Sequence, residues 1–145
     1  MIAINELRIN NYVYYNNEHN EIGIITKLVT ELITDINYVG INNRIDVYYL
    51  NKHINPIPIT KEWLLNFGFE KIESDFKIQI QKDNKDGNTD YWIYVDSGID
   101  NETNKFTIEI LCQEGCWFTS KNQYVHQLQN LYYALTKEEL TLNNK

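Results

Sequence analysis

Apolar residues recur at helical spacing most clearly towards the C-terminal end of the chain. The residues that repeat at intervals of three and four are Val125, Leu128, Leu131, Tyr132 and Leu135. Such intervals place side chains on one face of an α-helix. Ser120 can cap the start of this helix, and Gln123 can complete a capping box. The pattern predicts one long helix within residues 120–142 that packs its apolar face on the rest of the fold.

The first 58 residues show the shorter pattern of β-strands. Stretches rich in β-branched and aromatic residues, separated by Asn-rich turns, cover residues 12–15, 21–29, 33–39 and 45–50. Such residues favour pleated strands, and Asn favours turns. We expect about four or five short strands that form a small curled sheet or an SH3-like β-barrel.

Two prolines separate this half from residues 59–145. The sequence Pro56-Ile57-Pro58-Ile59 favours extended backbone, because proline fixes its own φ and disfavours helix at the preceding residue. Thr60 can then cap a short helix over residues 61–67. Gly68 can end that helix in a left-handed conformation, with Phe69 folding back after it.

The second half continues with strand-like stretches. Apolar and polar residues alternate over residues 76–81, and further strands are predicted over residues 91–95, 106–111 and 116–119. Consecutive strands joined by polar turns pair as an antiparallel meander with one buried face. We therefore expect an α+β fold and one compact unit: a β-barrel-like half (1–58), then a short helix, a meander of about four strands and the long C-terminal helix (59–145).

The predicted long helix also carries a second, polar stripe. Its members are His126, Gln129, Asn130 and Tyr133. Residues 122–136 contain no Lys, Arg, Asp or Glu, although a water-facing helix surface normally carries charges. We expect this stripe to be covered. Two explanations stay open: it binds a ligand, a host protein or a second copy of the chain in a homodimer, or it hydrogen-bonds the meander's loops and buried backbone.

Aromatic residues at strand spacing provide a second candidate site. Tyr91, Trp92 and Trp117 could stack on a nucleotide-like ligand together with Tyr94, Tyr132 and Tyr133. Aromatic residues at this spacing also build the cores of sheets, so both interpretations stay open. No Gly-rich phosphate loop accompanies them, and Arg8 and Arg44 are the only arginines.

Charge and hydropathy narrow the class of partner. The chain has 145 residues with 20 acidic and 13 basic side chains, which gives a net charge of −7. Phosphate contacts need clustered Lys and Arg, so we expect no binding to duplex nucleic acid, whereas a basic protein surface fits the charge. No apolar run reaches the length of a membrane span, and residues 1–11 lack the apolar region of a signal peptide. We expect a cytoplasmic protein with no membrane partner and with reduced cysteines.

No motif predicts catalysis, a metal site or a cofactor. Cys112 and Cys116 could face each other across a hairpin, but no second cysteine pair or suitably spaced His accompanies them. They are either two reduced thiols or a redox pair. Residues 83–90 resemble a calcium loop, but the spacing puts Lys82 where the first carboxylate ligand should be, so we interpret them as a polar turn. His19 and His53 have no neighbouring Ser, Cys or Asp in a catalytic motif.

Three stretches spread from end to end carry a family resemblance. They are residues 6–13 (ELRINNYV), 56–69 (PIPITKEWLLNFGF) and 124–136 (YVHQLQNLYYALT). Together they resemble a family of small proteins encoded by phages and prophages of Bacteroidota, including crAss-like phages. That family often has Gly where this chain has Asn10 and Lys137. Asn can adopt the left-handed conformation, whereas Lys137 argues against a sharp helix stop, and Thr136 with Glu139 could cap a further turn.

The resemblance implies a phage protein in the cytoplasm of the bacterial host, and it transfers no catalytic residue. We expect a non-enzymatic accessory protein that binds a host factor or a small ligand. Counter-defence is the version we favour, either by sequestering a nucleotide signal or by blocking a defence protein. A virion or assembly component is an alternative from another class, and a cryptic hydrolase is a third.

Overall fold

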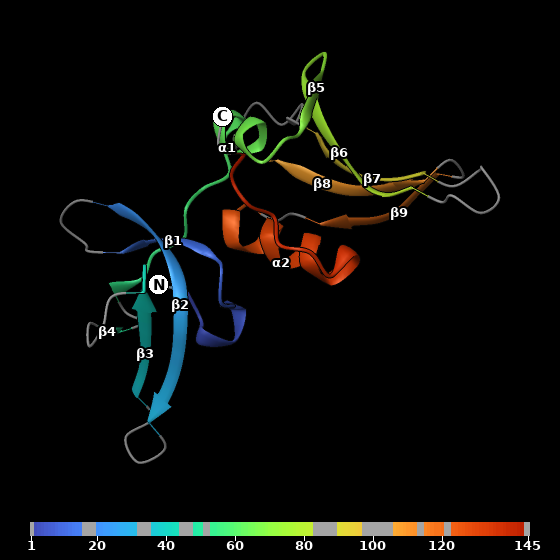
Figure 1. The fold of residues 1–145 in the computed structure, drawn as a ribbon. Helices are drawn as coiled ribbons and strands as arrows, with labels where there is room; N and C mark the ends of the chain where they lie inside the picture. The colour runs from blue at the N-terminus through green and yellow to red at the C-terminus, as the bar shows by residue number, and fades with distance from the viewer. Residues whose placement is uncertain are drawn as a thin grey trace. The chain divides into compact units, whose positions relative to one another are not determined.

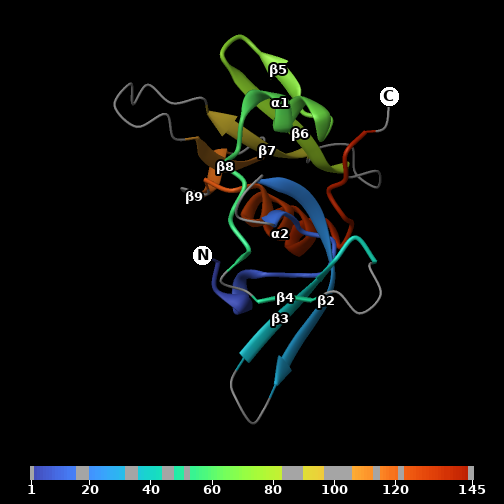
Figure 2. The same ribbon diagram turned by 90° about the vertical axis from the view of Figure 1, so that its left-hand side faces the viewer.

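The fold is α+β, and the chain divides into two compact units. A computed structural model describes residues 2–15, 20–31, 36–43, 48–50, 53–82, 90–96, 106–112, 115–120 and 123–143. The first unit consists of Met1–Pro58 with Tyr124–Asn130, and the second consists of Ile59–Gln123 with Leu131–Lys145. The C-terminal helix therefore contributes its first part to one unit and its last part to the other. Figures 1 and 2 show the ribbon from two directions.

The first unit is built on an antiparallel sheet. A 3₁₀ turn (Ile4–Glu6) precedes β1 (Tyr12–Tyr15), β2 (Glu21–Glu31), β3 (Ile36–Ile41) and β4 (Tyr48–Leu50). Among the described residues these strands form one four-stranded sheet in sequence order, with β2 and β3 as the long central hairpin. The buried core beneath it consists of Ile2, Leu7, Val13, Tyr15, Ile25, Val39, Ile41 and Ile54. Most of these core residues are β-branched or aromatic, the types that favour strands.

The sheet of the first unit is open, so the SH3-like barrel predicted from the sequence is wrong. In the described residues, β1 and β4 are the two edges and do not pair with each other. The outer edge of β1 instead bridges Asn55. Tyr14 N donates to Asn55 O over 3.0 Å, and Asn55 N donates to Tyr14 O over 2.9 Å. The extended backbone near the prolines thus covers the edge that a closing strand would otherwise occupy.

The second unit begins with the short helix α1 (Lys61–Asn66), which has the predicted caps. Thr60 Oγ1 accepts a hydrogen bond from Trp63 N over 3.4 Å. At the other end Gly68 has φ +88°, and Phe69 N donates to Leu64 O over 3.0 Å. This is a Schellman motif, in which a residue without a Cβ takes the left-handed position. The sequence-based predictions of the cap, the stop and the returning Phe69 are confirmed.

An antiparallel meander follows α1. Its strands are β5 (Glu70–Ile72), β6 (Asp75–Lys82), β7 (Asp90–Asp96), β8 (Thr107–Cys112) and β9 (Gly115–Ser120), and in the described part of the chain they pair in sequence order. The meander is thus confirmed, with β5 as a strand that the sequence analysis missed. The turn from β5 to β6 has no Gly; Glu73 itself takes φ +53° there. Phe76, Ile93, Val95 and Ile108 are fully or almost fully buried on one face of the sheet.

The long helix α2 (Val125–Thr136) begins later than predicted. Ser120 does not cap it, because Ser120 ends β9 and pairs with Ile108 of β8. The residues just before the helix are held in extended backbone. Ile59 N donates to Gln123 O, and Val125 N donates to Ile57 O, both over 2.9 Å. Ser120 therefore pairs within the sheet and does not start the helix, although the sequence around it has the pattern of a helix cap.

Helix α2 ends sharply at Thr136 although no Gly follows it. Lys137 takes the left-handed conformation itself, with φ +63°. Its ammonium group donates to Ala134 O over 3.2 Å and lies 5.9 Å from the centre of the Tyr133 ring. Thr136 Oγ1 accepts from Glu138 N over 3.0 Å, which starts an extended segment rather than a further helical turn.

Replacing Lys137 by Gly and by Ala should have different effects on stability. Both variants remove the ammonium contacts, but only Ala keeps a Cβ in a left-handed backbone. Lys137→Gly should therefore be more stable than Lys137→Ala by about 1 kcal/mol. Urea unfolding of the two variants measures this difference. Equal midpoints would show that the helix end relaxes to another conformation.

Candidate functional site

The polar stripe of α2 lies partly inside the first unit. His126 and Gln129 are 1% and 0% exposed, and Asn130 is half-buried. Gln129 Oε1 accepts from Tyr12 N over 2.8 Å, while Gln129 Nε2 donates to Asn10 O over 3.0 Å. One carboxamide thus pairs a backbone donor and a backbone acceptor on either side of Asn11.

Asn130 extends this network towards the N-terminus. Its Nδ2 donates to Glu6 O over 2.7 Å, and its Oδ1 accepts from Asn11 Nδ2 over 3.0 Å. Asn11 is itself fully buried and accepts from Arg8 N over 2.7 Å. We call Gln129, Asn130 and Asn11 the amide network. Its backbone partners lie at the start of β1 and just before it rather than in loops of the meander, and these bonds explain why Gln129 and Asn130 are polar without charge.

Removing the central carboxamide tests the amide network. Gln129→Leu should lower the free energy of unfolding by about 2–4 kcal/mol, because it removes the side-chain partner of the buried Tyr12 N and of the part-buried Asn10 O. The matched control is Gln79→Leu, the same change at an exposed position, which should stay within about 0.5 kcal/mol. Chemical denaturation of both variants provides the measurement. Equal losses would mean that water reaches the backbone before β1.

His126 lies beside this network without hydrogen bonds. Neither ring nitrogen has a hydrogen-bond partner among the described residues. Glu6 Oε2 is 3.7 Å from Nε2, which is beyond hydrogen-bonding range, and the Tyr124 ring stacks on the imidazole at 5.9 Å. Burial lowers the pKa of His126 below its usual 6.5, and the nearby Glu6 carboxylate only partly opposes that shift. The imidazole is therefore neutral in the folded protein at pH 7.

The neutral, buried state of His126 makes stability depend on pH. The unfolded chain takes up a proton near the ordinary pKa of 6.5, whereas the folded chain resists it. The contribution of His126 to stability is present above that pH and should be lost as the pH falls through 6.5 towards the lowered value. Thermal melts from pH 8 to pH 5 should show this loss in the wild type and a flatter profile in His126→Gln. Parallel profiles would place the titration on other groups.

The second candidate surface is the outer face of the meander, which is the face opposite Phe76 and Ile93. Strand alternation and register set two rows of side chains on it. One row runs Lys77, Tyr94, Glu109 and Thr119; the other runs Gln79, Trp92 and Leu111. Trp92 and Tyr94 are half-buried rather than covered. Two aromatic rings therefore lie in adjacent rows on an accessible sheet surface.

Tyr94 is held in a negatively charged environment on this outer face. Its hydroxyl donates to Asp75 Oδ2 over 2.6 Å. That hydrogen bond, burial and the charges of Asp75, Asp96 and Glu109 raise the pKa of Tyr94 to about 12. The hydrogen bond, the burial and the three negative charges each disfavour the phenolate form of Tyr94.

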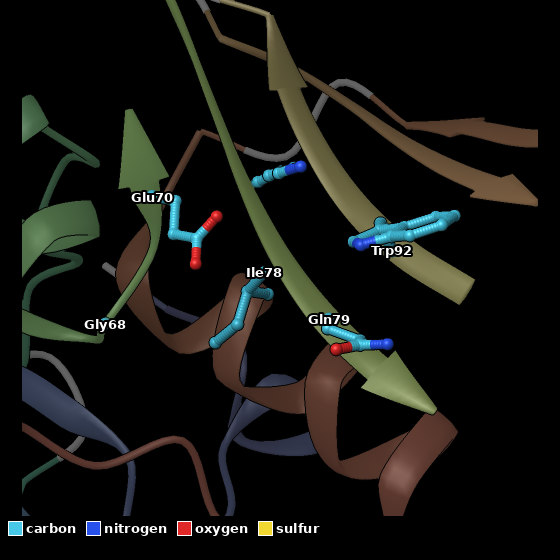
Figure 3. Close-up of a pocket in the computed structure, with 6 residues that line it drawn as sticks. Gly68, Glu70, Ile78, Gln79 and Trp92 are labelled. Carbon is cyan, nitrogen blue, oxygen red and sulfur yellow. The ribbon is translucent and has the colours of Figure 1, made fainter. Parts of the chain in front are cut away.

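A pocket of about 330 Å³ opens beside Trp92 on the same sheet. Its lining residues are Gly68, Glu70, Lys77, Ile78, Gln79 and Trp92. In Figure 3 the indole of Trp92 projects from β7, with Gln79 on the adjacent strand and the carboxylate of Glu70 on β5. Lys77 Nζ lies 5.9 Å from the centre of the Trp92 ring. The pocket thus combines an aromatic surface with an ammonium group, an amide and a carboxylate.

The other predicted site residues do not gather at this pocket. Tyr91 follows the alternation of β7 onto the face that carries Ile93, so it lies opposite Trp92. Trp117 belongs to β9, and its side chain lies outside the described part of the chain. Tyr133 is half-buried on α2 beside Lys137.

Three residues that line the pocket beside Trp92 were not predicted from the sequence: Glu70, Lys77 and Gln79. Lys77 and Gln79 were recognisable as the polar half of an alternating strand. Glu70 had no signal, because it enters the site on the unpredicted strand β5, opposite Lys77 in the ladder.

A second pocket, of about 470 Å³, lies in the first unit. It is lined by Ile9, Asn10, Ile24, Thr26, Asn42 and Asn43. Its asparagines build turns: Asn10, Asn42 and Asn43 all have positive φ, and Asn42 Oδ1 accepts from Ile24 N over 2.8 Å. Local turn chemistry explains these residues, so the pocket beside Trp92 is the stronger candidate.

Among the described residues, no side chains are assembled into a metal site or a cross-strand cysteine pair. No group of three or more His, Cys, Asp or Glu in this part of the chain is placed to hold a metal ion. The ladder sets Cys116 opposite Leu111 and Cys112 opposite Gly115, so the two cysteines are not direct cross-strand neighbours. No helix in the described part is long and apolar enough to span a membrane.

The structure is that of an α+β protein with an aromatic and polar pocket on an antiparallel sheet. No family model, curated protein or solved structure matches the chain.

Proposed function

We propose that this chain is a non-enzymatic binding protein, a phage accessory protein that holds a host factor or a small ligand on the outer face of the meander. The observation that carries the proposal is the pocket beside Trp92, where an exposed sheet surface presents an indole, an amide and two opposite charges. Such pockets bind by shape, stacking and a few placed polar groups.

The chemistry of the lining residues supports holding rather than converting a bound molecule. Lys77 and Glu70 face each other across the β5–β6 ladder, so each partly offsets the charge of the other. Gln79 offers an amide donor and acceptor, which does not transfer protons at neutral pH. His126 is the buried titratable side chain of α2, and it is enclosed in the first unit rather than open to a substrate.

Counter-defence is the biological role that we propose for this binding. A phage gains from a small protein that occupies a signal molecule or a defence protein of its host, and neither task needs a catalytic group. The resemblance of residues 6–13, 56–69 and 124–136 to phage and prophage proteins supports this setting.

Retention of an unaltered molecule tests the proposed function. Purified protein is mixed with an extract of the host bacterium and washed, and retained molecules are released by denaturation for mass spectrometry. The wild type should retain a host molecule in unchanged form, and Trp92→Ala should lose it. Leu65→Ala is the matched control, because it truncates an exposed apolar residue on α1 and should leave retention intact.

Two results would contradict the proposal. Release of a chemically converted product would indicate an enzyme. Equal retention by Trp92→Ala, with a melting temperature like that of the wild type, would place binding away from the outer face.

A further inference from the structure

The outer face of the meander carries an unequal set of charges around its two aromatic rings. Among the side chains that the structure describes, strand alternation puts one cation there, Lys77. The carboxylates on the same face are Glu70, Asp75, Asp96 and Glu109. Together they leave this face with a local negative charge, in line with the net charge of −7 for the whole chain.

Three of these carboxylates lie close enough to Tyr94 to act on its hydroxyl. Asp75, Asp96 and Glu109 come from three different strands, and all of them contribute to raising the pKa of Tyr94 to about 12. Tyr94 occupies the row next to Trp92. A positively charged group that reached this face would therefore meet the carboxylates and the aromatic rings together.

The indole of Trp92 already has a cation beside it. Lys77 Nζ lies 5.9 Å from the ring centre, at the outer limit of a cation–π contact. This lysine shows that an alkylammonium group fits beside the ring from the solvent side. It also lies opposite Glu70 in the β5–β6 ladder.

We infer that the outer face of the meander binds a basic, extended segment of a partner protein, with a Lys or Arg side chain against Trp92 and Tyr94 and its charge near Glu109 and Asp96. This inference rests on the proposed binding function and specifies the partner. It favours the blocking of a defence protein over the sequestering of a nucleotide. A nucleotide phosphate would bring negative charge to four carboxylates, and among the described side chains of this face only Lys77 could receive it.

The probes are a labelled peptide of alternating Lys and Gly residues, its Glu–Gly counterpart, and ATP. Fluorescence anisotropy with the full-length protein measures the peptide affinities, and calorimetry measures ATP. The Lys–Gly peptide should bind the wild type and neither other probe should. Trp92→Leu should weaken its binding roughly tenfold, and Glu109→Gln roughly threefold to tenfold.

The matched control is Glu138→Gln. It changes the net charge by the same amount as Glu109→Gln, but at an exposed position beyond the end of α2. It should leave the affinity for the Lys–Gly peptide unchanged. Equal weakening by the two Gln variants would reduce the binding to general attraction of a polycation and would overturn the inference. Thermal melts of each variant separate lost binding from lost folding.

The remaining outcomes separate the inference from the proposed function. If ATP or the Glu–Gly peptide binds in a Trp92-dependent way and the Lys–Gly peptide does not, the basic partner is wrong, while binding on the outer face stands. If no probe binds but a host molecule is retained in a Trp92-dependent way, the inference also fails and the proposed function stands. If no probe binds and no host molecule is retained in a Trp92-dependent way, both the inference and the proposed function are overturned.

Discussion

Backbone groups around the start of strand β1 need hydrogen-bond partners, and two side-chain amides of α2 supply them. Gln129 pairs Tyr12 N and Asn10 O, while Asn130 pairs Glu6 O and the Asn11 side chain. Unpaired polar groups in such a place are costly, so residues far apart in the sequence are fixed to each other. The same constraint explains why this part of α2 is polar but uncharged. The amides of this stripe accept and donate hydrogen bonds within the fold. An ionised group in place of the fully buried Gln129 would lack a counter-charge.

Strand alternation organises the second unit in a comparable way. One face of the meander carries Phe76, Ile93 and Val95 and is buried, which leaves the opposite face to polar and aromatic residues. Trp92 and Tyr94 are large rings on that opposite face. Aromatic side chains can lie on such an accessible surface without being part of the hydrophobic core. An aromatic surface with several carboxylates suits recognition of a partner better than it suits packing. The functional proposals follow from this division of the sheet into two chemically different faces.

Several local features could be predicted from the sequence. The cap at Thr60 and the left-handed Gly68 were recognisable because each depends on a few neighbouring residues. The alternation of residues 76–79 likewise indicated which side of β6 would be buried, and a bulge between Gln79 and Gln81 ends that alternation. Asn10 also adopts the left-handed backbone expected of it, with φ +73°. The start of α2 was missed, because a capping pattern at Ser120 competes with ladder pairing that is visible only when β8 lies beside it.

The sequence by itself determined which residues turn, which alternate and which lie on one helical face, since these properties arise from backbone sterics and side-chain periodicity over a few positions. It also determined the excess of negative charge. Only the tertiary structure decided what the polar stripe of α2 meets, because the hydrogen-bond partners of Gln129 lie 117 and 119 residues away in the chain. It likewise separated Tyr91 from Trp92 onto opposite faces and brought Glu70 opposite Lys77. Those arrangements depend on which strands pair and in what register, and no short stretch of sequence contains that information.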